Sequence, residues 1–205
     1  MKINQYISMN GHYSRRKIDS LIKKGKVTIN SKVCHHHEAV SPNDLVQIDG
    51  KVIENIGKPI YLILNKPVGI TCTAQKTVDG NIIDYMNYPH YIFPVGRLDK
   101  DSDGLIIMTN DGEISNKILR SEMNHEKEYI VTVDQPITEA FLEGMAQGVE
   151  ILATKTKPCQ VTRISDFVFR IILTQGLNRQ IRRMCKMFGY RVIRLQRIRI
   201  MNLTL

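Results

Sequence analysis

The chain has 205 residues, of which 42% are hydrophobic, and its formal net charge is +9. This composition supports a folded core and excludes a disordered chain, and the length fits one large domain or a small domain plus a medium one. No apolar run approaches the roughly 20 residues of a membrane helix, and the N-terminus lacks the apolar stretch of a signal peptide. We therefore expect a cytoplasmic protein without membrane contact. The positive charge favours a polyanionic partner, although it also fits a soluble protein that is merely basic.

The four cysteines, Cys34, Cys72, Cys159 and Cys185, lie far apart and form no C-x-x-C pair. In a chain without an export signal we expect reduced thiols that serve mainly in packing. The stretch Cys34-His35-His36-His37 has a composition that can indicate a metal site. Adjacent residues rarely point at one ion, however, and no second ligand pair follows at a useful spacing, so we expect a loop without metal.

The first 58 residues form a basic segment with ten Lys or Arg and five Asp or Glu. A short helix is expected from Ile3 to about Gly11. Ser14 is a suitable N-cap for a second helix, which ends at Gly25. Two short alternating strands follow at 27–30 and 45–48. A polar stretch with Gly and Pro then predicts a break, so we divide the chain into a module at 1–52, a linker at 53–59 and a second domain at 60–205.

Strand and helix patterns are mixed in the second segment. The predicted strands are 61–64, 105–108, 129–133, 160–164, 168–173 and 191–205. The predicted helices are 111–119, 138–145 and 178–188, which open on the capping residues Asp111, Thr138 and Asn178. Strands outnumber helices and do not alternate with them regularly, which favours an α+β fold over a doubly wound α/β sheet.

Six cations lie on or beside the second predicted helix: Arg15, Arg16, Lys17, Lys23, Lys24 and Lys26. Cations at a helix start oppose the helix dipole, so a phosphate partner explains them better than folding does. The alternative is a solvated helix face, which is the usual meaning of such a charge run. The stretch Tyr6–Asn30, with Pro42–Lys51 as closing strand and turn, resembles the small α/β module first seen in ribosomal small-subunit protein four. This resemblance implies that the basic face holds structured RNA.

The stretch 97–105, Arg-Leu-Asp-Lys-Asp-Ser-Asp-Gly-Leu, is open to two interpretations. Asp99, Asp101, Asp103 and Gly104 fall at positions 1, 3, 5 and 6 of a calcium-binding loop. The match fails at position 12, where Asn110 stands in place of the bidentate Glu. Pro and Gly precede the loop where a helix should enter, and the exit resembles a strand. These departures argue against calcium.

The second interpretation of this stretch is a catalytic loop. It resembles the central motif R-L-D-x-x-S-x-G-L of the pseudouridine synthases, with Asp99 as the carboxylate. Three more stretches resemble motifs of that superfamily in the expected order: Asn65–Gly69, Lys127–Val131 and Gly176–Met184. Four ordered matches are far more specific than one. Over essentially the whole chain, the pattern is most similar to the RsuA, RluB, RluE and RluF family of bacterial enzymes, and within it to the RluF subgroup.

The resemblance implies an N-terminal module like that of ribosomal protein four, followed by a domain with a mixed, mainly antiparallel sheet. It implies an enzyme that isomerises a uridine of structured RNA, with 23S ribosomal RNA as the first candidate and transfer RNA as an alternative. No cofactor is needed, because atoms are only rearranged. Asp99 would act as nucleophile or as base, on C1′, on the uracil ring or on a sugar proton. Without the flanking motif, Asp99 would be an ordinary turn aspartate.

Further residues receive roles by resemblance. Arg182 would keep the buried Asp99 ionised, and Tyr129 would stack on the flipped uracil and take the proton from C5. Arg97 would fill the vacated stack or hold a phosphate. Alternatively, Tyr129 is an ordinary strand aromatic and Arg97 a salt-bridge partner in the acidic loop. Lys127 would support the pocket on its RNA-binding side.

The predicted helix 178–188 supports this interpretation from its residues alone. Its apolar positions form one stripe, and its basic residues fall on the other faces. From Gly176 to Leu205 there is no Asp or Glu, whereas a purely structural helix would usually carry compensating acids. We therefore expect Arg179 and Arg183 to bind RNA.

Relatives usually continue beyond Arg-Ile-Met-Asn with a Gly-containing strand and a Trp-Arg segment, whereas this chain ends at Leu205 and contains no Trp. We expect a catalytic domain that is short at its C-terminal edge. The main alternative to an enzyme is a non-catalytic RNA-binding protein, such as a ribosome assembly factor. The presence of Asp99, Tyr129 and Arg182 argues against it. We expect a monomer.

Overall fold

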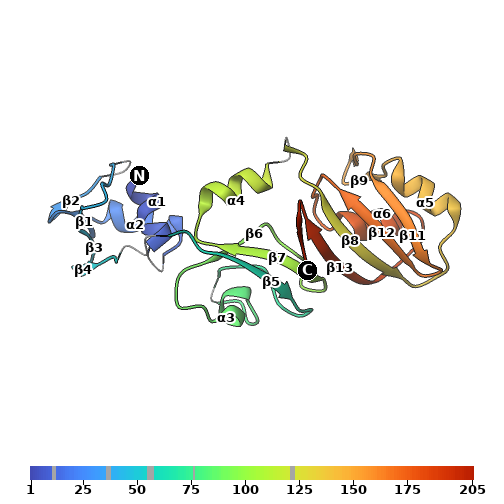
Figure 1. The fold of residues 1–205 in the computed structure, drawn as a ribbon, viewed down its shortest axis with the longest axis horizontal. Coiled ribbons are helices and arrows are strands. Elements are labelled where there is room, and N and C mark those ends of the chain that lie inside the picture. The colour runs from blue at the N-terminus through green and yellow to red at the C-terminus, as the bar shows by residue number, and fades with distance from the viewer. Residues whose placement is uncertain (11–12, 36–37, 55–57, 76, 121–122) are drawn as a thin grey trace.

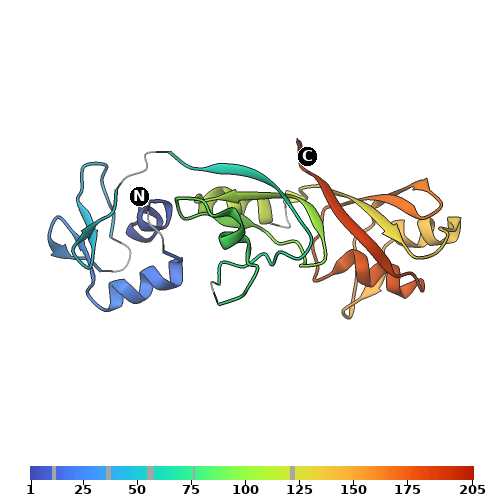
Figure 2. The same cartoon turned by 90° about the horizontal axis from the view of Figure 1, so that it is seen from below.

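The computed structural model describes residues 1–205 except 11–12, 36–37, 55–57, 76 and 121–122. The molecule is elongated, with the N-terminal segment at one end and the C-terminus near the middle of its length (Figures 1 and 2). Among the described residues, no helix combines the length and apolar character that crossing a membrane requires.

The N-terminal module consists of two helices and four short strands: α1 (Ile3–Asn10), α2 (Arg15–Lys23), β1 (Val27–Ile29), β2 (Lys32–Val33), β3 (Val46–Ile48) and β4 (Lys51–Val52). Its strands form an antiparallel sheet in the order β2-β1-β3-β4. Ser14 caps α2 by accepting a hydrogen bond from the Lys17 amide, as its position predicts. Ile18, Leu21 and Ile22 of α2 pack with apolar residues of α1 and the sheet in one buried core. The module is therefore built around a core of its own.

A mixed eight-stranded sheet forms the rest of the molecule, with the main path β11-β12-β8-β13-β7-β5. Its strands are β5 (Tyr61–Lys66), β6 (Phe93–Val95), β7 (Asp103–Thr109), β8 (Lys127–Val133), β11 (Gln160–Ser165), β12 (Val168–Leu173), β13 (Val192–Ile200) and β14 (Leu203–Thr204). β13 and β7 run parallel, and the other pairs are antiparallel. The predicted α+β class with a mainly antiparallel sheet is confirmed.

β7 lies between β13 and β5 in the sheet, and all seven of its residues are buried. Ile106 and Met108 point to one core together with Ile82 of α3 (Ile82–Met86). The alternate residues Leu105 and Ile107 point to a second core, against which α4 (Gly112–Leu119) packs. Successive strand residues face opposite sides, so an apolar run without alternation produces a strand that is covered on both faces.

The far half of the sheet is covered on one face by α5 (Glu139–Ala146) and α6 (Gln180–Met187). Val131 of β8, Phe169 of β12 and Leu195 of β13 pack under these helices in one core. The Phe141 ring of α5 meets the Phe169 ring edge to face at a centroid distance of 5.4 Å. A small hairpin, β9 (Glu150–Ile151) and β10 (Thr154–Lys155), completes this half. This packing fixes α6, and hence its arginines, over the sheet.

The predicted strands and helices are present, with ends that differ by a few residues. Short elements were not predicted: β2, β4, α3, β6, β9, β10 and the turn that separates β13 from β14. The prediction that Asn178 caps α6 is wrong. The N-cap is Arg179, with φ 50° and ψ 36° and without a side-chain capping bond. The Asn178 side chain instead accepts a hydrogen bond from Arg183 at 3.1 Å.

Candidate active site

Asp99 lies in the loop that joins β6 to β7, and the backbone on both sides of it is held in place. The side chain of Leu98 is buried in the core beside α3, and its amide donates to Cys72 Sγ at 3.4 Å. After Asp99, the Lys100 carbonyl accepts a hydrogen bond of 2.8 Å from the Gly69 amide. The amide of Ser102 donates to the Asp99 carbonyl at 3.1 Å. The carboxylate is therefore presented from a fixed turn, with 30% of its side chain exposed.

Lys66 supports the neighbouring turn from inside the protein. Its side chain is fully buried at the end of β5, and Nζ donates to the carbonyls of Pro67 and Ile70 at 2.8 and 2.9 Å. Burial lowers the pKa of Lys66, against the opposing pull of nearby acidic groups. Because Gly69 lies within this turn, Lys66 indirectly stabilises the loop that carries Asp99.

Two arginines at the start of α6 reach the Asp99 carboxylate. Arg179 Nη1 lies 3.7 Å and Arg182 Nε 3.9 Å from Asp99 Oδ2. Arg182 is largely buried and is fixed by three donated bonds, to the carbonyls of Asp101 and Val192 and to Ser102 Oγ, at 2.8, 3.3 and 3.2 Å. Its Nε has no hydrogen-bond partner among the described residues, although it lies within ion-pair range of two carboxylates. The result is a positive environment around Asp99.

Asp101 binds the same two arginines more closely than Asp99 does. Its carboxylate accepts two hydrogen bonds from Arg179, at 3.2 and 3.0 Å, and lies 3.5 Å from Arg182 Nε. Burial opposes ionisation of Asp101, but the bonds from Arg179 and the charge of Arg182 outweigh it and lower the pKa of Asp101. The same bonds raise the pKa of Arg179. Arg179 makes this contact from a left-handed backbone conformation, which is unfavourable for a residue with a Cβ.

Gly104, the glycine of the loop motif, allows β7 to lie close beside β13. Its φ is +109°, and a Cβ at this position would overlap the backbone of Arg197 in β13. β7 and β13 are paired here in parallel, with Gly104 opposite Arg197. Any other residue would push the two strands apart, so the motif glycine positions the loop relative to the central strands.

Tyr129 lies on β8 where the two large cores meet, and its side chain packs against both. Its partner on the adjacent strand β13 is Arg197. Arg197 is buried and donates from Nε to the Leu105 carbonyl at 2.7 Å. Arg197 Nη2 has no hydrogen-bond partner among the described residues. Lys127, two residues before Tyr129 on the same face of the strand, has a pKa lowered by burial and by the charge of Arg197. The Tyr129 region is therefore cationic.

Arg97, which precedes the buried Leu98, is exposed. It forms no ion pair with any other residue that the structure describes, so the alternative of a salt bridge inside the acidic loop gains no support. The third loop carboxylate, Asp103, instead pairs with Arg194 of β13 at 2.8 Å. All three loop carboxylates thus face arginines of the C-terminal segment.

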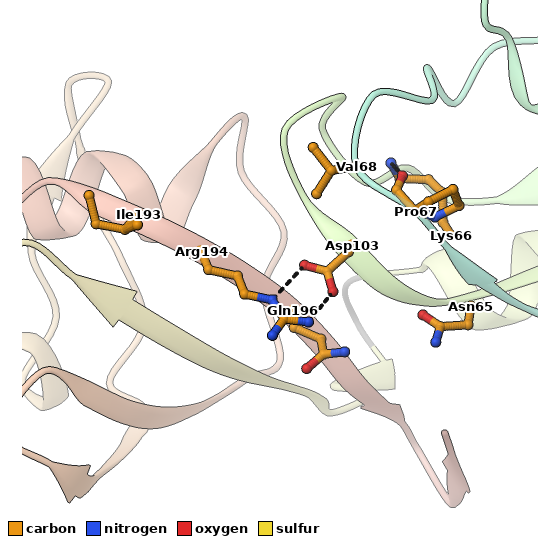
Figure 3. Close-up of a pocket in the computed structure, with 8 residues that line it drawn as sticks. All are labelled: Asn65, Lys66, Pro67, Val68, Asp103, Ile193, Arg194 and Gln196. Carbon is orange, nitrogen blue, oxygen red and sulfur yellow. Dashed lines mark hydrogen bonds and ion pairs between the residues drawn. The ribbon is translucent and has the colours of Figure 1, made fainter.

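A hollow of about 470 Å³ lies beside this loop, between the Pro67 turn and β13. Its lining residues are Asn65, Lys66, Pro67, Val68, Asp103, Ile193, Arg194 and Gln196 (Figure 3). Arg194 and Gln196 alternate with Leu195 and Arg197 along β13, so they point to the face opposite Tyr129. The hollow therefore lies behind the Asp99 loop, on the face of the sheet opposite Tyr129 and α6.

The residues predicted to bind RNA occupy three places. Lys17, Lys24 and Lys26 line a hollow of about 300 Å³ on the module, together with Tyr13 and Asp49. Arg15, Arg16 and Lys23 are exposed on α2, and the end of the Arg15 side chain also lies close to Gly112 of α4. Arg179, Arg183 and Lys127 belong to the second domain, where Arg183 donates two bonds to Asn178. Of the stretch Cys34-His35-His36-His37, residues 36 and 37 lie outside the described residues.

Residues 60–187 match the family model described as RNA pseudouridylate synthase. The chain is 51% identical over 207 residues to the dual-specificity RNA pseudouridine synthase RluF of Escherichia coli (strain K12), covering all of this chain and 71% of that protein. The chain belongs to the RNA pseudouridine synthase family. It is also 32% identical to ribosomal large subunit pseudouridine synthase B of Bacillus subtilis (strain 168), over 96% of this chain and 84% of that one. A solved pseudouridylate synthase, 26% identical, superposes with a TM-score of 0.69 over 100% of this chain and 90% of that one.

Three residues of the site were not predicted from the sequence. Asp101 was noticed only as part of a calcium-like spacing, although that spacing also places it two residues from Asp99. Arg197 lies two residues after the apolar Leu195, so the two side chains share one face of the strand. This spacing could have identified Arg197 as a buried arginine. Cys72, which accepts the bond from the Leu98 amide, carries no recognisable signal in the sequence.

Proposed function

We propose that this RNA pseudouridine synthase modifies uridines of large-subunit ribosomal RNA, and that Asp99 is its reacting carboxylate. The observation that carries the proposal is the pair of guanidinium groups at 3.7 and 3.9 Å from the Asp99 carboxylate. The two guanidinium groups orient the partly buried carboxylate and stabilise its negative charge, as a nucleophile or base in this position requires. Two relatives point to the substrate. The name of the B. subtilis protein specifies the ribosomal large subunit, and that of E. coli RluF specifies dual specificity.

In the reaction, the C1′–N1 bond breaks, the uracil turns and C5 bonds to C1′. The C5 proton is lost and N1 gains a proton, so no external reactant is consumed. Asp99 assists by attack or by proton removal at the nucleoside, and it is regenerated at the end. Arg179 and Arg182 stabilise its negative charge before and after this step.

Tyr129 and Arg97 have separate roles in this proposal. The target base must leave its stack, and an aromatic ring recovers part of that cost. Tyr129 provides this ring at the junction of the two cores, beside Lys127 and Arg197. Arg97 is exposed next to the catalytic loop and therefore available to the RNA strand that the base has left.

The N-terminal module, proposed as residues 1–52 with a linker at 53–59, holds the RNA outside the catalytic domain. The hollow lined by Lys17, Lys24 and Lys26 combines cations with the Tyr13 ring; Lys26 is paired with Asp49 at 2.9 Å, so Lys17 and Lys24 make the phosphate contact in this proposal. Such a surface suits a phosphate backbone with an adjacent base or sugar. Arg183 and Lys127 extend the cationic contact in the catalytic domain.

The test uses purified protein, in vitro transcribed 23S RNA and quantitative pseudouridine detection. Wild-type protein should form pseudouridine at a defined position, and Asp99→Asn should lose turnover while its RNA affinity changes less than about threefold. Asp166→Asn, the same substitution at an exposed turn between β11 and β12, is the matched control and should remain active. An active Asp99→Asn protein would overturn the catalytic assignment. A wild type active only on transfer RNA would overturn the substrate.

A further inference from the structure

A small joint connects the N-terminal module to the catalytic domain, and Asn110 is at its centre. Asn110 follows β7 and is 1% exposed. Its Oδ1 accepts a hydrogen bond of 2.8 Å from the Ile60 amide at the start of the catalytic domain. Its Nδ2 donates a bond of 2.7 Å to the Met9 carbonyl in the last turn of α1. Because carbonyls in the last turn of a helix lack intrahelical partners, this side chain satisfies a group that the module leaves free.

Two further contacts surround Asn110. Gln5 Nε2 of α1 donates to Glu113 Oε1 of α4 at 2.9 Å. The Arg15 guanidinium lies so close to Gly112 that a Cβ at this position would overlap Nη2. Two residues of α1 and the first residue of α2 therefore meet one segment of the catalytic domain, 110–113, at the start of α4. Figure 1 shows α1 and α2 on the side of the molecule where β5 begins.

The joint is connected rigidly to the catalytic loop. β7 begins at Asp103, directly after the loop that carries Asp99, and ends at Thr109, directly before Asn110. All of its residues are buried, and it pairs with β5, β6 and β13. Seven residues of strand at roughly 3.3 Å each make a strut of about 23 Å. One buried strand therefore sets the distance between the catalytic carboxylate and the module contact.

We propose that Asn110 is a specificity-determining residue that fixes the RNA-binding module at a set distance from Asp99. The inference rests on the proposed function, because it assumes that RNA contacts the module and the Asp99 site together. Simultaneous contact at two sites of one rigid body strengthens binding only for RNA whose shape spans both. The joint selects large structured RNA in which a phosphate surface lies at the matching distance from the target uridine. A short stem-loop reaches the catalytic domain alone and gains nothing from the joint.

Asn110→Asp tests this with little change in shape. The aspartate keeps an oxygen acceptor for the Ile60 amide but has no donor for the Met9 carbonyl, and its charge is repelled by the C-terminal end of α1. Asn116→Asp is the matched control, since it makes the same change at an exposed position of α4 away from the joint. Both variants add one negative charge, so a general loss of RNA attraction affects them equally.

Each variant is assayed on intact 23S RNA and on a stem-loop of the mapped target uridine. For Asn110→Asp we expect KM for the long RNA to rise about tenfold with kcat unchanged, and kcat/KM for the stem-loop to change less than twofold. Asn116→Asp should match wild type on both. Equal impairment on both substrates would overturn the proposal, because Asn110 would then act through the catalytic loop. No change on either would also overturn it.

Small-angle scattering provides a readout that does not depend on activity. Asn110→Asp should increase the radius of gyration and broaden the distance distribution relative to wild type and Asn116→Asp. An unchanged scattering profile would contradict a joint held by Asn110. If wild-type protein formed no pseudouridine in either RNA, the proposed function would fail, whereas the scattering comparison would still decide whether the joint exists.

Discussion

Two basic regions of this chain look alike in sequence and differ in the fold. At α6 and β13, the arginines meet carboxylates from a distant loop: Arg179 and Arg182 at Asp101, and Arg194 at Asp103. On the module, the cations of α2 are exposed, and Lys17 and Lys24 line an open hollow. The first region is a charge network within the protein, and the second is an exposed cationic surface that we propose binds an external anion. A run of arginines without nearby acids in sequence therefore does not by itself indicate an RNA surface.

Removal of Arg182 should have the largest effect on activity and is the strongest test of this difference between the two regions. Arg182→Ala deletes three hydrogen bonds and leaves Asp99 and Asp101 without their buried cation. We expect kcat to fall about 300-fold, since one preorganised electrostatic donor is worth roughly two to three orders of magnitude. Single-turnover pseudouridine formation at saturating enzyme measures it, with Lys186→Ala on the exposed face of α6 as control. A loss confined to KM would assign Arg182 to RNA binding.

Arg179 has a smaller expected effect because its side chain is 44% exposed. We choose Arg179→Gly, since glycine adopts φ 50° without strain and the fold should not lose stability. We expect kcat to fall about 20-fold, with a melting temperature within about 2 °C of wild type. An unchanged kcat with weakened RNA binding would contradict this role and assign Arg179 to RNA contact, as the sequence predicts.

The module cations should behave in the opposite way. For Lys17→Ala combined with Lys24→Ala, we expect about fivefold weaker RNA binding at moderate salt and an unchanged kcat. Each lost phosphate contact should reduce the slope of log affinity against log salt by about one. Filter binding across a salt series measures both quantities, and a reduced kcat at saturating RNA would contradict the division between the two regions.

Asp101 provides the smallest expected effect, and it depends on pH. Its pKa is lowered in the folded protein, so its contribution to stability is present above the ordinary value of 3.8 and is lost as pH falls through the lower folded value. Its side chain is 48% exposed, so we expect wild type to exceed Asp101→Asn by less than about 1 kcal/mol at pH 7. Denaturant unfolding at pH 7 and pH 3 measures it. A difference that grew towards pH 3 would have the wrong sign.

The sequence motifs predicted which residues surround Asp99, because the family resemblance places them together. Gly104 is needed where β7 pairs closely with β13, and Leu98 anchors the loop in a core. The N-caps of α2, α4 and α5 were also predictable from the sequence. Ser14, Asp111 and Thr138 each accept hydrogen bonds from backbone amides within one helical turn. The caps depend on chemistry within one helical turn, whereas Gly104 and Leu98 make contacts with distant residues, Arg197 and Cys72, and were predicted through the motif.

What the sequence did not predict depends on long-range pairing. The family resemblance predicted that Arg182 lies beside Asp99, but local charge counting did not predict that Asp101, about 80 residues earlier, pairs with both Arg179 and Arg182. Arg197 faces Tyr129 only because of the register between β13 and β8, which contains two bulges. Arg15 belongs to a basic run, yet the fold turns it towards Gly112 and the joint. In each case, whether an arginine is paired or exposed depends on its tertiary contacts and not on its neighbours in the sequence.

The measurement that tests the account most directly is a pseudouridine map of total RNA from cells with and without this gene. We predict that a uridine of 23S RNA loses its modification without the gene and regains it with wild-type protein, but not with Asp99→Asn. Restoration by Asp99→Asn would contradict the role of Asp99. An unchanged map would contradict the proposed substrate.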